Sequence, residues 1–328
     1  MNKPGDASSA AALIGIDWGS TGMRGFLIGN SGLILATRNS SAGASTLTGA
    51  AQFEDALQQL TGDWQQARPG LPLLACGMVG SQHGWQEVSY ASCPIEPVQL
   101  AAQLAPANSA GLRIVPGLLH APEQGVPDVM RGEETQIVGA LHAQPELTAR
   151  ACIIMPGTHS KWVRIQDGRI DRFATHMTGE LFAVLSKYSV LGRLMAPRAS
   201  ADLPAFFAGV DAVRDASAPG LTHQLFSARS LPLSGKMRGE EVGDYLSGLL
   251  ITHELLAGLA WRRAADLQSA PMVLVGEPDL CQRYALALQR LGWAADLLLP
   301  NTAPAGLWFL AHSAGLLGGM QPSFPESM

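Results

Sequence analysis

Short apolar runs bounded by glycine and polar turns recur along the chain, and this pattern predicts buried strands rather than long amphipathic helices. The first run ends at a glycine-rich turn, and two further runs follow at hairpin distance, which predicts a meander. In the first half the expected elements are strands over 13–17, 24–28, 33–37, 71–75 and 112–116 and a helix over 52–60. This order predicts an α/β fold.

The second half repeats the order, beginning after a predicted helix over 134–142. Its expected strands are 151–155, 161–165, 169–175, 272–275 and 297–299, and its helices 179–188, 240–264, 279–291 and 305–317, with helix and loops over 196–236. Each half opens with an apolar strand, a glycine turn carrying hydroxyl residues, and a hairpin. The repeat predicts two domains of one architecture, 10–118 (with 304–320 as a candidate completion) and 119–303.

Composition limits the function classes. The 328 residues are 47% hydrophobic and 15% charged, enough apolar material for two cores. The 22 basic and 27 acidic residues give a net charge of -5, which does not favour nucleic-acid binding. The four cysteines lack zinc spacing and predict reduced thiols in the cytoplasm. No signal peptide is visible over 1–12, and the apolar segment 306–320 is too short to span a membrane, so no membrane partner is expected.

The turn DWGSTGMR, after the first strand, carries the strongest chemical signal. Asp17, at the strand's end, can hold a hydrated Mg²⁺. Gly19 permits close backbone approach, and Ser20 and Thr21 can donate hydrogen bonds to phosphate oxygens, with Arg24 closing the motif. The pattern predicts a phosphate cradle between two hairpin strands. The alternative is an ordinary polar turn.

The turn PGTHSKW stands at the same place in the second half. Its Gly157, Thr158 and Lys161 are candidate phosphate ligands. Two such turns facing each other across a cleft would grip the β- and γ-phosphates of a nucleotide from both sides. The alternative is an unrelated turn with a solvated Lys161.

The segment DVMRGEETQ places Glu133 and Glu134 at a helix start. A carboxylate there can act as general base on an alcohol, although acidic residues also favour helix starts because they complement the dipole. The letters MRGEE recur at 237–241 before another helix, so at least one copy must be capping. Only the first copy lies just upstream of the second phosphate turn, and it is favoured as the base.

Two further turns are candidate ligand contacts. CGMVGSQHGW follows a strand, where Ser81 and Gln82 can bond hydroxyls or a carboxylate and Trp85 offers a flat wall, unless the segment is only a structural loop. The strand–glycine–helix turn at Gly276 could face an adenosine. No Walker, Rossmann or zincin motif occurs.

Taken in order from about residue 13 to 320, seven segments resemble the 2-dehydro-3-deoxygalactonokinase family of the sugar kinase and actin-like ATPase superfamily. They are DWGSTGMRGFLI, ACGMVGSQHGW, IVPGLLH, PDVMRGEETQIVGAL, PGTHSKWVRI, MTGELFAVLS and DYLSGLLI. The resemblance implies two actin-like (ribonuclease H-like) domains with mixed sheets and an active site in the interdomain cleft. It implies ATP- and Mg²⁺-dependent phosphorylation of the 6-hydroxyl of 2-dehydro-3-deoxy-D-galactonate in galactonate catabolism in the cytoplasm.

Carried over by position, the resemblance gives each candidate a role. Related sugar kinases carry Gly-Asp where Gly132-Glu133 stands here, so Glu133 is the implied base and Glu134 the alternative. The remaining implied roles are Asp17 for Mg²⁺, Gly19, Ser20, Thr21, Gly157 and Thr158 for phosphate, Gly276 for adenosine, Ser81, Gln82 and Trp85 for the acceptor, and Arg131 for its carboxylate.

Two rival functions stay open. One is a kinase for another sugar acid or a hexose, because no residue decides between galactonate- and gluconate-derived acceptors. The other is an ATP-driven switch protein on the same fold, against which the GSQHGW segment argues. A homodimer is a candidate assembly.

Overall fold

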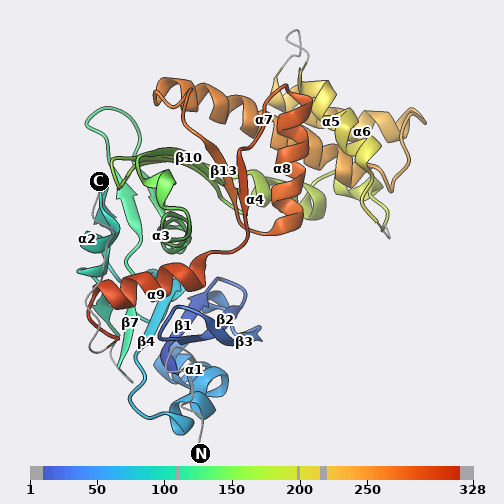
Figure 1. Cartoon of the computed structure of the whole chain (residues 1–328). Coiled ribbons are helices and arrows are strands. Elements are labelled where there is room, and N and C mark those ends of the chain that lie inside the picture. Colours follow the sequence, from blue (N-terminus) through green and yellow to red (C-terminus); the bar gives the residue numbers. More distant parts are fainter. Residues whose placement is uncertain (1–9, 108–110, 198–199, 215–219, 318–328) are drawn as a thin grey trace, which may run out of the picture. The chain divides into compact units, whose positions relative to one another are not determined.

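The computed structural model describes residues 10–107, 111–197, 200–214 and 220–317 (Figure 1). Its contacts divide the chain into two compact units. Unit 1 is Met1–Arg150, Ile165–Arg172 and Asn301–Met328, and unit 2 is Ala151–Arg164 and Phe173–Pro300. Residues 1–9 and 318–320, on which the signal-peptide and C-terminal predictions partly fall, lie outside the described residues.

Unit 1 contains a six-stranded mixed sheet of order β3-β2-β1-β4-β7-β6. The strands are β1 (Ala11–Trp18), β2 (Met23–Gly29), β3 (Ile34–Ser40), β4 (Leu73–Gly77), β6 (Ala105–Pro106) and β7 (Leu112–Ile114). β1, β2 and β3 form the predicted antiparallel meander, and β4 and β7 continue from β1 in parallel. The parallel strands therefore end together at one edge, where their turns meet.

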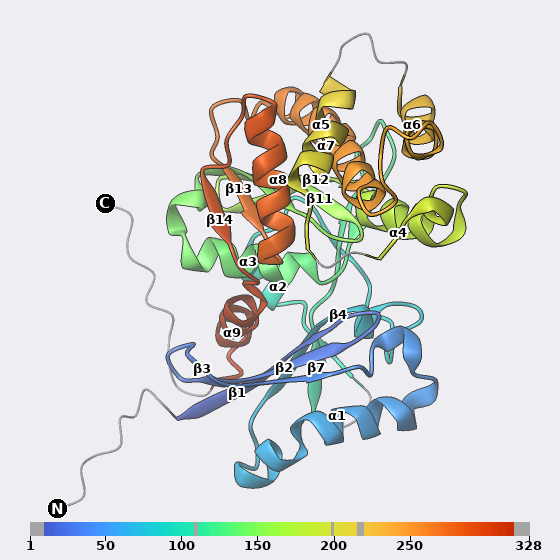
Figure 2. The ribbon, with the colours of Figure 1, turned by 90° about the vertical axis from the view of Figure 1, so that its right-hand side faces the viewer.

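Helices cover both faces of this sheet (Figure 2). α1 (Gly49–Ala67) contacts β2 and β3, and α9 (Ala303–Ser313) contacts β1, β2 and β4. Ile14, Ile16 and Trp18 alternate along β1 and bury their side chains in one core with residues of α1. The unit also contains α2 (Pro97–Ala101), α3 (Glu133–Ala143) and a three-stranded sheet of β5 (Ala91–Ser92), β8 (Leu118–His120) and β9 (Asp128–Met130).

The contacts place α3 in unit 1, whereas the sequence predicted a boundary at 118/119. α3 and α9 cross where each carries a glycine. A Cβ added to Gly139 would lie 2.0 Å from the carbonyl oxygen of Thr302, and one on Gly306 would lie 1.9 Å from that of Thr135. Only glycine permits this approach. The compact unit thus extends to Arg150.

A five-stranded sheet of order β12-β11-β10-β13-β14 belongs mainly to unit 2, while Ile165–Arg172 at the tip of its β11–β12 hairpin belongs to unit 1. The strands of this sheet are β10 (Arg150–Met155), β11 (Ser160–Gln166), β12 (Arg169–His176), β13 (Met272–Val275) and β14 (Leu297–Leu299). β10, β13 and β14 are parallel, so the order repeats that of β3-β2-β1-β4-β7 in unit 1. The predicted α/β fold with mixed sheets and an architectural repeat is confirmed.

The helices of unit 2 gather around its longest member. They are α4 (Thr178–Tyr188), α5 (Leu203–Arg214), α6 (Leu221–Leu233), α7 (Val242–Ala264) and α8 (Pro278–Arg290). α7 packs against each of the other four. Among the described residues no helix is both long and apolar enough to cross a membrane.

Candidate functional site

In unit 1 the candidate residues gather where β1 and β4 end. Asp17 is partly exposed and is paired in the β-ladder with Arg24. Burial raises the pKa of the Asp17 carboxyl, opposed by Arg24 and by a hydrogen bond from the Asn301 side chain, while the charge of Glu133 raises it further. Asn301 also accepts the N–H of Ala303 at 2.9 Å. Asn301 therefore links Asp17 to the start of α9 through hydrogen bonds. No sequence motif predicted this link.

The turn after Asp17 is held by its carbonyl groups. The carbonyl oxygen of Gly19 accepts the N–H of Ala44 at 2.9 Å. That of Ser20 accepts the N–H of Ser45 at 3.0 Å and its hydroxyl at 2.6 Å. The Ser20 and Thr21 residues themselves are exposed. The carbonyl bonds thus fix the turn while its two hydroxyls stay available to a ligand, as a phosphate cradle requires.

The start of α3 lies against the end of β4. Gly132 has φ +109°, a conformation that favours glycine, and a Cβ there would lie 3.3 Å from the Cα of Gly77. Glu133 is partly exposed and its Oε2 accepts the N–H of Arg131 at 3.1 Å. Glu134 is fully buried, and its oxygens accept the N–H of Gly132 at 2.5 Å and the hydroxyl of Thr135 at 3.0 Å. A substrate could reach Glu133 but not Glu134.

Burial raises the pKa of the Glu134 carboxyl to about 8, and the neighbouring charge of Glu133 adds to this. The folded protein then holds a proton that the unfolded chain releases near pH 4.5. Stability due to this group is present at pH 4 and is lost as the pH rises toward 8. Glu134→Gln has no proton to lose, so we expect its melting temperature to gain on that of the wild type between pH 5 and pH 8.

Thermal unfolding of both proteins across this range measures the effect. Glu146→Gln, at an exposed position, is the control and should follow the wild type at every pH. Parallel curves for Glu134→Gln and the wild type would contradict the buried proton.

The segment after β4 carries the three predicted acceptor contacts. Ser81 is partly exposed and Gln82 is exposed. Ser81 begins a tight turn in which its carbonyl accepts the N–H of Gly84 at 2.9 Å. The Trp85 ring stacks on Phe53 at 5.8 Å and meets Trp18 edge-on at 6.1 Å, so most of its surface packs against the core of unit 1.

Arg131 lies beside this segment. Its Nη2 donates to the carbonyl of Val88 at 2.7 Å, and its guanidinium stands 4.4 Å from the centre of the Tyr90 ring. Nε and Nη1 are buried and have no hydrogen-bond partner among the described residues. Buried donors are normally satisfied, and an anionic ligand that shifted this side chain could supply the missing acceptor.

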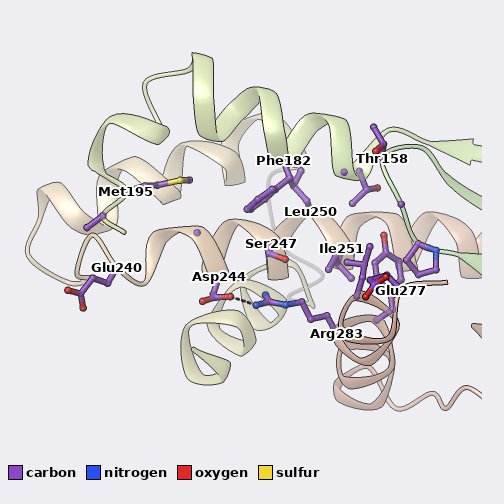
Figure 3. A pocket seen from close by; sticks show the side chains of 18 residues that line it. Thr158, Phe182, Met195, Glu240, Asp244, Ser247, Leu250, Ile251, Glu277 and Arg283 are labelled. Carbon is purple, nitrogen blue, oxygen red and sulfur yellow. Dashed lines mark ion pairs between the residues drawn. The ribbon is translucent and has the colours of Figure 1, made fainter. Parts of the chain in front are cut away.

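Unit 2 contains a pocket of about 700 Å³ that begins at the second predicted turn (Figure 3). Such a volume suits a small-molecule ligand. Thr158 and Glu240 lie at opposite ends of the view. Ser247 and the ion pair that Asp244 forms with Arg283 (2.7 Å) lie in the part of the pocket that separates them. The other labelled side chains of the lining are Phe182, Met195, Leu250, Ile251 and Glu277. Apart from Thr158, none of these residues was a sequence candidate, because they are scattered over three helices (α4, α7 and α8) and intervening loops.

The start of α4 packs directly on the second turn. The N–H of Glu180 donates to the carbonyl of Thr158 at 3.0 Å, and a Cβ on Gly179 would lie 2.4 Å from the carbonyl oxygen of Gly157. Gly157 and Thr158 line the pocket. Lys161 is 3% exposed and its Nζ donates to the carbonyl of His159 at 3.2 Å, so it is a buried rather than solvated cation.

Two other segments considered in the sequence, the turn at Gly276 and the second MRGEE copy, also lie at this pocket. Gly276 lies beside the second turn, since a Cβ there would be 3.6 Å from the carbonyl oxygen of Pro156, and its neighbour Glu277 lines the pocket. In the second MRGEE copy, Glu241 is the N-cap of α7, but Glu240 lines the pocket. The second MRGEE copy therefore both caps α7, through Glu241, and contributes Glu240 to the pocket lining.

Comparisons with known proteins agree on one family. A family model described as 2-keto-3-deoxy-galactonokinase matches residues 17–310. The 2-dehydro-3-deoxygalactonokinase of Escherichia coli (strain K12) is 35% identical over 92% of this chain and 98% of its own. A crystal structure described as a candidate 2-dehydro-3-deoxygalactonokinase from Sinorhizobium meliloti has a TM-score of 0.80 and 31% identity, covering 94% of this chain and 100% of that one.

A more distant structure shares the fold. The activator of 2-hydroxyisocaproyl-CoA dehydratase from Clostridium difficile has a TM-score of 0.51 at 15% identity, covering 95% of this chain and 99% of that one. The two-domain actin-like fold implied by the sequence resemblance is thereby shown.

Proposed function

The chain belongs to the 2-keto-3-deoxy-galactonokinase family, and from this membership we infer that it phosphorylates 2-dehydro-3-deoxygalactonate with ATP. The acceptor atom we propose is the terminal 6-hydroxyl. The observation that carries the site assignment is the partly exposed carboxylate of Glu133, close enough to Asp17 for its charge to raise the pKa of the Asp17 carboxyl, at one edge of the unit 1 sheet. A base beside a phosphate-binding turn is what phosphoryl transfer to an alcohol requires.

We propose that unit 2 binds the nucleotide in its pocket. The second turn and the N-terminus of the 11-residue α4 form the end suited to anions, because a helix start attracts phosphate. The phosphates would therefore lie at Gly157 and Thr158. The nucleoside would lie toward Ser247 and the Asp244–Arg283 pair, where apolar side chains alternate with polar ones.

We propose that unit 1 binds the acceptor. The two unpartnered guanidinium nitrogens of Arg131, Nε and Nη1, suit the carboxylate of a sugar acid. Ser81 and Gln82 are available to its hydroxyls. Trp85, packed into the core, supports the segment that carries them. A carboxylate-binding arginine distinguishes a sugar-acid kinase from a hexose kinase.

The proposed step is a single in-line transfer. Glu133 accepts the proton of the 6-hydroxyl, and the freed oxygen forms a bond to the γ-phosphorus. The bond from the γ-phosphorus to the β,γ-bridging oxygen breaks, and its electron pair leaves with ADP. Ser20 and Thr21 on the turn of unit 1 can donate hydrogen bonds to phosphoryl oxygens, and Thr158 can do the same on the turn of unit 2.

The residues at Asp17 fit a hydrated magnesium ion. Mg²⁺ keeps several waters and usually takes one or two carboxylates together with substrate phosphates. Asp17 supplies one carboxylate, and within the described part of the chain no cluster of three or more His, Cys, Asp or Glu side chains could hold an ion. The ion, when bound, would neutralise part of the phosphate charge.

An acceptor panel tests the function. The purified protein is given ATP and Mg²⁺ with 2-dehydro-3-deoxygalactonate, its gluconate-derived epimer, or a neutral hexose, and ADP release is followed by a coupled assay. We expect the galactonate-derived acid to have the highest kcat/KM. Preference for a hexose would refute the role of Arg131, and ADP release independent of any acceptor would indicate an ATPase.

Thr158→Val tests the nucleotide end of the pocket. It removes a hydroxyl assigned to phosphate and nearly keeps the side chain's shape. A hydrogen bond to a charged group is worth about 1.5–3 kcal/mol, so we expect ADP affinity to fall roughly 10- to 100-fold. Calorimetry with ADP and with the sugar acid measures both. Thr222→Val, at an exposed position of α6, should leave both affinities unchanged. If the sugar acid alone lost affinity, the turn would be misassigned.

A further inference from the structure

A buried chain of hydrogen bonds leads from the second turn into the helices of unit 2. The Ser160 hydroxyl lies 3.1 Å from that of Tyr284, which donates to Glu254 Oε2 at 2.5 Å. Trp162 Nε1 donates to Glu254 Oε1 at 3.0 Å. At the turn itself, the N–H of Gly157 donates to Ser160 Oγ at 3.3 Å. The four linked side chains are each at most 3% exposed.

The direction of this chain is fixed by its two ends. The N–H of Gly157 can only donate, and Glu254 accepts from both Tyr284 and Trp162. Tyr284 has one proton, which it gives to Glu254, so in the bond between the two hydroxyls Ser160 is the donor. The Ser160 hydroxyl also lies 3.5 Å from the carbonyl oxygen of Gly157, a longer contact than the one to Tyr284. Burial raises the pKa of the Tyr284 phenol well above its usual value, and the proton stays in place at any working pH.

The chain connects three elements to one turn. Glu254 belongs to α7 and Tyr284 to α8, and the Thr178 side chain, at the start of α4, also hydrogen-bonds to Tyr284. Gly157, Thr178 and Tyr284 all line the pocket. Within the described part of the chain, Glu254 is a buried carboxyl group that forms no salt bridge with a Lys, Arg or His side chain. Its hydrogen bonds from two neutral donors only partly replace those that water would make. Burying such a group costs stability, which favours a role in the site.

We propose that Tyr284 is a positioning residue for phosphoryl transfer, and that its hydroxyl, through Ser160 and with Glu254 as anchor, holds the second turn in its phosphate-binding conformation. The proposal rests on the nucleotide site inferred above. It assigns a role to Tyr284 and Glu254, which lie outside every sequence motif, and to Ser160 within the second turn. It also implies that the N–H of Gly157 orients the turn and that Thr158 makes the direct bond to phosphate.

The test compares two tyrosines that lose the same atom. Tyr284→Phe keeps the ring in the core and removes the hydroxyl. Tyr245→Phe, on α7, removes a buried hydroxyl that lies 2.6 Å from Ser227 and is outside the pocket lining. We expect Tyr284→Phe to raise the KM for ATP and weaken ADP binding about tenfold, the cost of one lost hydrogen bond, with the KM for the sugar acid unchanged. Tyr245→Phe should leave both KM values as in the wild type while lowering the melting temperature comparably.

A double-mutant cycle distinguishes a positioning role of Tyr284 from a general loss of packing in unit 2. Ser160→Ala should weaken ADP binding as Tyr284→Phe does, and the double variant should be no weaker than either, because both break one chain. Additive losses, or equal losses in Tyr284→Phe and Tyr245→Phe, would overturn the proposal. Should Tyr284→Phe fail to fold, Ser160→Ala measured against Tyr245→Phe decides alone. If wild-type protein did not bind ADP, the nucleotide site itself would fail, a result distinct from Tyr284→Phe binding normally.

Discussion

Glu133→Gln is expected to lower the rate of phosphoryl transfer about 10²–10⁴-fold, the usual contribution of a general base. The amide keeps the size of the side chain, and its oxygen can still accept the N–H of Arg131 that Glu133 accepts at 3.1 Å. The start of α3 should therefore be preserved. Affinity for the sugar acid should change little, because the amide oxygen can still accept a bond from the 6-hydroxyl. What is lost is the proton acceptor.

The measurement is single-turnover transfer at saturating ATP and acceptor, which separates chemistry from product release. Glu134→Gln is the informative comparison. Glu134 is fully buried and satisfied by Gly132 and Thr135, so its replacement should act mainly on stability. Glu146→Gln is the neutral control. A loss confined to Glu134→Gln would move the base by one residue, and no loss in either variant would remove the base from this helix.

The strands could be predicted because their signal is local. Met272–Val275 and Leu297–Leu299 have the predicted bounds. A short apolar run between polar turns suits a parallel strand covered on both faces, as β13 is, whereas β14 at the end of the sheet is only partly buried. The boundary between the units could not be predicted in the same way. It depends on how closely two helices far apart in sequence approach, through Gly139 and Gly306, and an isolated glycine in a helical pattern does not reveal its partner.

The residues of the candidate site also fall into two groups, those with a local sequence signal and those without one. Its turns are contiguous motifs, and the structure places the unit 1 motifs at one sheet edge and the second turn at one end of a pocket. The residues that support them are single positions: Asn301 beside Asp17, and Tyr284 and Glu254 behind Ser160. These contacts join residues far apart in the chain, and a polar residue in a helix gives no sign of its distant partner. Glu240 shows the opposite problem. The sequence MRGEE around it is the same as that around Glu133, yet the two glutamates lie in different surroundings.

Asp17→Asn is expected to lower turnover by at least about 10²–10³-fold, the scale seen when one group that stabilises transition-state charge is removed. The amide can still accept the hydrogen bond from Asn301. Because burial raises the pKa of Asp17, its ionised form is less favourable in the folded chain than in the unfolded one. The stability this costs increases as the pH rises through the folded pKa, so at pH 7 the variant should melt no lower than the wild type.

The distinguishing measurement is ADP affinity with and without Mg²⁺. If Asp17 holds the hydrated ion, Mg²⁺ should strengthen ADP binding to the wild type but much less to Asp17→Asn, while affinity without metal stays similar. Asp55→Asn, at an exposed position of α1, should behave as the wild type in both assays. An unchanged turnover in Asp17→Asn would refute the first phosphate turn. A lost turnover with a normal Mg²⁺ effect would keep the turn catalytic and place the ion elsewhere, because the negative charge of Asp17 would then act on the reacting groups directly.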